Sequence, residues 1–180
     1  MGVEVQAIDG AVFGGIVTGV DASQIDDAVA DQLRAASRDH HGVLCFCFDE
    51  LLTVDELNAL TAVFGENEFA PGMITGIGKG PIEGEREQSV DAQIDDLRAK
   101  GIDPYLMYLG NVDPHTGERR EVNEKFFGEW EWHSDMSYIP APPTFSLLHS
   151  RRVPKEGGDT GFCSQVLAAR TLPTELRARV

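Results

Sequence analysis

The stretch EWEWHSDMSYIPAPP, residues 129–143, carries the residues that decide the fold assignment of this chain. His133 and Asp135 stand two positions apart, after Trp132 and before a proline-rich run. Alternate side chains of a strand point to one face, so on a strand the imidazole and the carboxylate would lie side by side. A nitrogen and an oxygen ligand together suit a divalent first-row metal. The alternative is an ordinary polar patch, because a His-x-Asp spacing is by itself a weak motif.

Further motifs surround this pair. WHSD at 132–135 is followed by Tyr138, by Pro142-Pro143, by GGDT at 157–160 and by the pair Leu172-Pro173. In front of it stand GGIVTGVD, GVLCFCF and FGE, at 14–21, 42–48 and 64–66. This order of motifs resembles the taurine dioxygenase and aryloxyacetate dioxygenase (TauD/TfdA) family of Fe(II)- and 2-oxoglutarate-dependent oxygenases, over nearly the whole chain.

The resemblance implies a β-rich α+β fold, a double-stranded β-helix (jelly roll) with flanking helices. It implies that His133 and Asp135 are the first two iron ligands and that Thr160 donates a hydrogen bond to 2-oxoglutarate. A turn-capping role is the alternative for Thr160. For Trp132 and Tyr138, lining of the pocket and packing in the core are equally open.

The implied activity is hydroxylation of a small organic substrate, expected to be anionic, with O₂ consumed and succinate and CO₂ released. The family's third ligand is a histidine far downstream, followed by an arginine that pairs with 2-oxoglutarate. The chain ends at Val180, and only His149 follows the HSD motif, on an expected strand. We therefore expect residues 1–180 to be the N-terminal part of a single dioxygenase domain. A non-catalytic jelly-roll binding protein and an inactive fragment remain the alternatives.

Periodicity and capping signals predict the order of elements. Ser23 with Asp26, and Thr53 with Glu56, fit the capping-box pattern at two helix starts. The glycine-rich segment 66–104 is expected to be either a lid with a small helix of its own or an ordinary flexible loop. The expected strands are 3–8, 15–20, 43–48, 105–112, 144–153 and 160–164, and the expected helices are 23–40, 53–65, 89–100 and 165–180, the last broken at Pro173.

Charge and composition narrow the partners. The net charge is −15, which disfavours nucleic acid and anionic membranes. No run of eighteen apolar residues is present, so no membrane span is expected. Three cysteines without an export signal favour a reducing cytoplasm, and Cys45 and Cys47 are expected to be buried in a strand. The expected partners are a small-molecule substrate and O₂, with a homo-oligomer possible.

Overall fold

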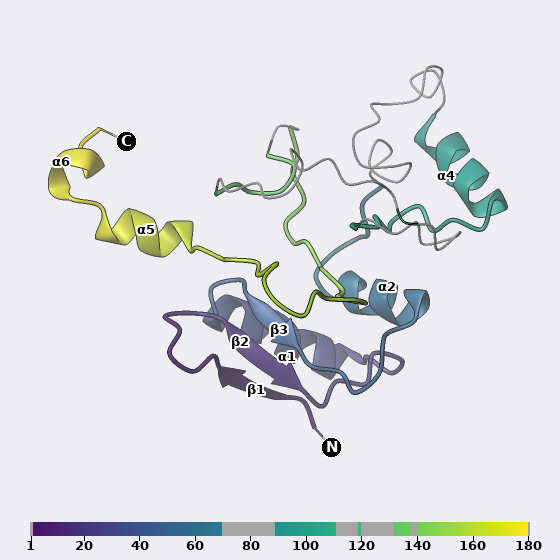
Figure 1. Ribbon diagram of the computed structural model, residues 1–180, viewed down its shortest axis with the longest axis horizontal. Helices are drawn as coiled ribbons and strands as arrows, with labels where there is room; N and C mark the ends of the chain where they lie inside the picture. Colours follow the sequence, from purple (N-terminus) through teal and green to yellow (C-terminus); the bar gives the residue numbers. More distant parts are fainter. Residues whose placement is uncertain (1, 70–88, 111–118, 120–131, 138–139, 180) are drawn as a thin grey trace. The chain divides into compact units, whose positions relative to one another are not determined.

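The computed structural model describes residues 2–69, 89–110, 119, 132–137 and 140–179 (Figure 1). The chain divides into two compact units. One combines Met1–Gly65 with Thr144–Val180, and the other is Glu66–Pro143. That both belong to a single domain stays a prediction.

A three-stranded mixed sheet forms the first unit, in the order β1-β2-β3 (Figure 1). Strand β1 (Glu4–Ala7) pairs antiparallel with β2 (Gly15–Thr18), and β2 pairs parallel with β3 (Leu44–Phe46). The parallel pair is connected through a helix, as parallel neighbours require. The strands predicted at 3–8, 15–20 and 43–48 are therefore confirmed; the first and third are shorter at both ends, and the second is shorter at its C-terminal end.

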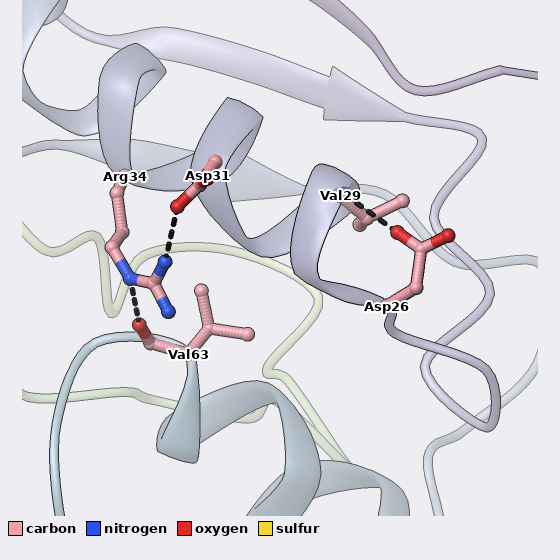
Figure 2. A network of polar contacts seen from close by, with 5 residues as sticks. All are labelled: Asp26, Val29, Asp31, Arg34 and Val63. Carbon is pink, nitrogen blue, oxygen red and sulfur yellow. Dashed lines mark hydrogen bonds and ion pairs between the residues drawn. The ribbon is translucent and has the colours of Figure 1, made fainter.

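Helix α1 (Asp27–Asp39) connects β2 and β3. The Asp26 carboxylate accepts a hydrogen bond from the backbone N–H of Val29 at 2.8 Å and caps the first turn (Figure 2). The predicted start at Ser23 is wrong. The backbone N–H and hydroxyl of Ser23 both donate to Asp21, so Ser23 belongs to the turn before the helix. These hydrogen bonds also hold the pKa of Asp21 below its ordinary value.

The core lies between α1, the sheet and helix α2 (Val54–Ala62). Leu33 of α1 is 0 % exposed and Val17 of β2 is 1 % exposed. Ala30 and Ala36 of the same helix are buried as well, whereas Ala28 is exposed. The buried members of the cluster are Val17, Ala30, Leu33, Leu60 and Val63.

The start of α2 confirms its predicted capping box. The Glu56 backbone N–H donates to the Thr53 hydroxyl at 3.2 Å, and the Thr53 backbone N–H donates to the Glu56 carboxylate at 2.8 Å. Leu60 is buried, while Leu57 and Phe64 are half-buried on the same side. The helix therefore turns its predicted apolar face to the core.

Arg34 connects α1 to the end of α2 (Figure 2). Its Nε donates to the carbonyl of Val63, the residue that ends α2, at 2.8 Å. Its Nη1 forms an ion pair with Asp31 at 2.7 Å. The last carbonyls of a helix lack partners within the helix and carry partial negative charge, so a guanidinium there is favourable.

Strand β3 differs from its prediction on one face. Cys45 and Cys47 are exposed, whereas Leu44, Phe46 and Phe48 are half-buried against the core. Side chains alternate along a strand, so Leu44, Phe46 and Phe48 share the face that packs on the buried cluster of α1 and α2. Cys45 and Cys47 lie on the opposite face. The expectation that both cysteines are buried is therefore wrong. Partial desolvation, and then the neighbouring Cys47, raise the pKa of Cys45.

Residues 144–164 form no strand in the described part of the chain, contrary to the predictions for 144–153 and 160–164. A strand needs a partner for its backbone groups, and no described segment pairs with this one. Leu147 still packs on the core, and the Phe145 ring lies 5.0 Å from that of Phe64. The segment also carries exposed apolar side chains, which are Phe145, Leu148, Val153 and Phe162.

The last helices follow the prediction. Helix α5 (Gln165–Thr171) is capped by the Ser164 hydroxyl, which accepts from Leu167, and α6 (Thr174–Arg177) begins after Pro173. None of the helices in the described ranges is long and apolar enough to cross a membrane.

In the second unit, helix α4 (Val90–Ala99) confirms the helix predicted at 89–100. The Ser89 hydroxyl accepts from Ala92 at 3.2 Å and caps it. Residues 106–109 are not in a strand, so the strand predicted at 105–112 is absent from the described part of that range. Residues 70–88 and 111–118 lie outside the described residues, and the lid therefore stays a prediction.

Replacement of Arg34 by Met tests the connection between α1 and α2. Arg34→Met keeps the apolar stem and leaves the Val63 carbonyl without its charged donor. The free energy of unfolding is expected to fall by about 1–3 kcal/mol. Asp31→Ala is the matched control, because it removes only an exposed ion pair worth about 0.5 kcal/mol or less. Urea unfolding of both variants measures the difference, and equal losses would contradict the role given to the Val63 contact.

The exposed apolar side chains of residues 144–164 predict self-association of the 180-residue chain, because contiguous apolar surface favours association. Sedimentation velocity is expected to show species larger than a monomer that grow with concentration. Leu148→Ser combined with Phe162→Ser is expected to reduce them. Val12→Ser, at an exposed position outside this segment, is the control. A monodisperse monomer at every concentration would refute the prediction.

Candidate metal centre

The predicted metal ligands lie at a turn and not on a paired strand. Residues 132–134 are irregular and residues 135–137 form a turn, in which the Ser137 backbone N–H donates to the Ser134 carbonyl at 3.4 Å. Met136 has a positive φ of 50°. The strand geometry that would place the two side chains on one face is therefore absent from residues 132–137.

The two predicted ligands nevertheless lie close together. His133 Nε2 lies 3.5 Å from Asp135 Oδ1, and the two side chains are 51 % and 57 % exposed. Two ligand atoms about 2.1 Å from one ion at a right angle would be separated by about 3 Å. A contraction of a few tenths of an ångström would therefore let both atoms bind the same ion. The donor set, one imidazole nitrogen and one carboxylate oxygen, fits a divalent first-row metal.

The predictions for the two aromatic residues, Trp132 and Tyr138, have different outcomes. Trp132 is 70 % exposed, so the core alternative is wrong for it. Its role in lining a pocket stays a prediction. Tyr138 lies outside the described residues.

Thr160 belongs to the first unit, whereas His133 and Asp135 belong to the second. The turn expected before Thr160 is present, since Gly157 and Gly158 have φ values of 70° and 77°. A Cβ at Gly158 would lie 3.0 Å from Pro154 Cγ, so this position needs glycine for two reasons. Thr160 is exposed, and its contact with 2-oxoglutarate stays a prediction.

No third ligand is found among the residues that the structure describes. There, no group of three or more His, Cys, Asp and Glu side chains could hold a metal ion. His149, the histidine that follows HSD, is half-buried in the first unit. Among the described residues, the candidate centre therefore consists of the two predicted ligands, His133 and Asp135.

Sequence reasoning missed Met136. The position would have been marked as a turn by Gly or Asn, the residues that favour positive φ, but methionine carries no such signal.

Comparison with known proteins assigns the chain to a family. The model of the family described as "Taurine catabolism dioxygenase TauD, TfdA family" matches residues 4–180. The chain therefore belongs to the TauD/TfdA family, as its motifs predicted. The family implies the jelly-roll fold, and its α-ketoglutarate-dependent dioxygenases use Fe(II) and 2-oxoglutarate. The small mixed sheet described above neither confirms nor contradicts the jelly roll for this chain.

Individual relatives agree with the family. The chain is 28 % identical over 170 residues to the (S)-phenoxypropionate/alpha-ketoglutarate-dioxygenase of Sphingobium herbicidovorans. The matched region covers 94 % of this chain and 48 % of the relative. It is 26 % identical to pentalenolactone F synthase of Streptomyces avermitilis, over 98 % of this chain and 50 % of the relative. Over 72 residues it is 35 % identical to the alpha-ketoglutarate-dependent 2,4-dichlorophenoxyacetate dioxygenase of Cupriavidus pinatubonensis, covering 39 % of this chain and 25 % of that enzyme.

The chain spans about half the length of the first two relatives. No solved structure matches it at a significant level.

The candidate centre predicts divalent metal binding that depends on both ligands. Co(II) titrated into the gene product is expected to bind in wild type, and His133→Ala and Asp135→Ala are each expected to weaken binding by about tenfold or more, since the loss of even an outer partner costs about that much. Visible absorption of Co(II) measures the affinity. His149→Ala is the control and should bind as wild type does. Equal affinity in all four proteins would contradict the site.

Proposed function

We propose that this protein is part or all of an Fe(II)- and 2-oxoglutarate-dependent dioxygenase that hydroxylates a small organic anion and releases succinate and CO₂. The observation that carries the proposal is the 3.5 Å separation of His133 Nε2 and Asp135 Oδ1 in a chain of the TauD/TfdA family. Partly exposed ligand atoms in a turn leave one side of an ion open to other ligands.

The roles of the residues follow from their chemistry. His133 would bind Fe(II) through its neutral imidazole and Asp135 through its carboxylate. One carboxylate against two positive charges leaves net positive charge at the ion, which favours a dianionic co-substrate. Thr160 would donate its hydroxyl proton to a carboxylate of 2-oxoglutarate. Bound Fe(II) would supply the activation of O₂ that is coupled to decarboxylation of 2-oxoglutarate.

The names of the relatives support an anionic substrate. Phenoxypropionate and 2,4-dichlorophenoxyacetate are named in two of the relatives above, and both are carboxylates. A further relative, 33 % identical over 70 residues, is named the alpha-ketoglutarate-dependent sulfate ester dioxygenase of Pseudomonas putida, and a sulfate monoester is also anionic. We propose the same class for this protein, with O₂ and 2-oxoglutarate as its other small-molecule partners. The net charge of −15 supports the absence of nucleic-acid and anionic-membrane partners.

Succinate formation tests the proposed activity. The gene product is incubated with Fe(II), 2-oxoglutarate and O₂, with aryloxyalkanoates and alkyl sulfates as candidate substrates. Succinate is expected to form only with O₂ present and to be lost in His133→Ala and Asp135→Ala, while His149→Ala keeps it. Metal binding without any succinate would favour the non-catalytic alternative. Succinate formation that persists in both ligand variants would overturn the proposal.

Replacement of Thr160 by Val tests the co-substrate contact. Thr160→Val keeps the volume and removes the donor, at a cost of about 1.5–3 kcal/mol for a hydrogen bond to a charged group. The KM for 2-oxoglutarate is therefore expected to rise about tenfold to a hundredfold. Thr144→Val, another exposed threonine of the same unit, is the control. An unchanged KM in Thr160→Val would assign this threonine to the turn alone.

A further inference from the structure

Two cysteine side chains project from the same exposed face of strand β3 and its direct continuation. Cys45 and Cys47 are two positions apart and both exposed, whereas Phe46 between them is half-buried against the core. Side chains at positions i and i+2 of an extended chain point to one face, so the two thiols are neighbours on the face opposite the core. Neither of them has a role in the proposed dioxygenase chemistry.

The backbone that carries the two thiols is held by strand β2, which lies beside β3 in Figure 1. Cys45 is paired with Ile16 in the parallel ladder. The Cys47 N–H donates to the Val17 carbonyl at 2.9 Å, so the pairing continues past the end of β3. Val17 is a member of the buried core cluster. The fold therefore fixes the positions from which both thiols project.

The two thiols also interact with each other. Desolvation is the largest cause that raises the pKa of Cys45, followed by the charge of Cys47 and by a hydrogen bond between the two side chains. Two thiolates at this separation repel each other, whereas a cation between them attracts both. The pair is therefore better suited to sharing a cation than to carrying two free negative charges.

Strand geometry opposes a disulfide bond, which is the competing use of two neighbouring cysteines. Residues i and i+2 of a strand are about 6.6 Å apart, and because their side chains are nearly parallel, the Cβ atoms keep about the same separation. A disulfide needs Cβ atoms about 3.5–4.5 Å apart. An ion about 2.3 Å from each sulfur leaves the two sulfurs about 4.5 Å apart, which side chains on one strand face can reach. The spacing therefore favours a bridging ion.

The ligands select a soft cation that needs few of them. Thiolates favour soft ions, of which Cu(I) and Zn(II) are common in proteins. Zn(II) in a structural site takes four ligands. Among the residues that the structure describes, no group of three or more His, Cys, Asp and Glu side chains could hold a metal ion. Cu(I) is the better fit, because two thiolates on opposite sides of it complete its coordination.

We propose that Cys45 and Cys47 form a chelating site for Cu(I). Two copper–sulfur bonds form on binding, and each thiol gives its proton to solvent. Copper stays in the Cu(I) state, so no oxidant or reductant is consumed. The inference is independent of the proposed dioxygenase function, because the site uses neither of the predicted iron ligands.

Competition for Cu(I) with bicinchoninate, under anaerobic conditions with ascorbate as reductant, tests the site. The gene product is expected to take one Cu(I) from the chelator. Cys45→Ser and Cys47→Ser should each weaken binding by about a hundredfold or more, since the loss of even an outer partner of a metal ligand costs about ten- to a hundredfold. Cys163→Ser, at the third exposed cysteine, is the matched control and should bind as wild type does. His133→Ala should also leave the Cu(I) affinity unchanged.

X-ray absorption at the copper edge identifies the ligands, and two sulfur neighbours in a linear arrangement are expected. Equal Cu(I) affinity in wild type, Cys45→Ser and Cys47→Ser would overturn the site. Dimers that form with one Cu(I) per two chains would overturn it as well, because the ion would then bridge two molecules. Circular dichroism monitors folding, and Cys45→Ala and Cys47→Ala repeat the comparison for any serine variant that is unfolded.

Discussion

The burial of Leu33 between helices and sheet is the constraint on which the described core depends. Leu33 is completely buried and Val17, its partner in the same cluster, is almost so. Each such side chain contributes about 1.5–3 kcal/mol relative to exposure. Because α1 is also the crossover between the parallel strands β2 and β3, the same packing fixes the register of the sheet. Arg34, the next residue, also holds α2 against α1, because its Nε donates a hydrogen bond to the Val63 carbonyl at the end of α2.

The candidate metal centre depends on a different and more local constraint. Its two predicted ligands come from a three-residue stretch, in which His133 Nε2 lies 3.5 Å from Asp135 Oδ1, and no described strand pairs with that stretch. A site built this way needs few other residues to bring its first two ligands together.

Local signals explain what could be predicted from the sequence. The capping box at Thr53 and the break at Pro173 located helices correctly, because these signals act within one turn of the chain. The HSD and GGDT motifs likewise identified the family. A strand was predicted at 144–153 but is absent from the described residues, because a strand depends on partners that are distant in sequence. The predicted burial of Cys45 was wrong because burial depends on tertiary neighbours. The turn at Met136 was not predicted because methionine is no turn signal.

Anomalous diffraction from crystals of the gene product soaked with Mn(II) would test most directly whether His133 and Asp135 bind one ion. The predicted result is a single strong peak about 2.2 Å from both His133 Nε2 and Asp135 Oδ1, with the turn at Met136 retained. Crystals of Asp135→Ala treated in the same way should show a much weaker peak. A peak remote from these two atoms, or one of equal height in the variant, would contradict the assignment.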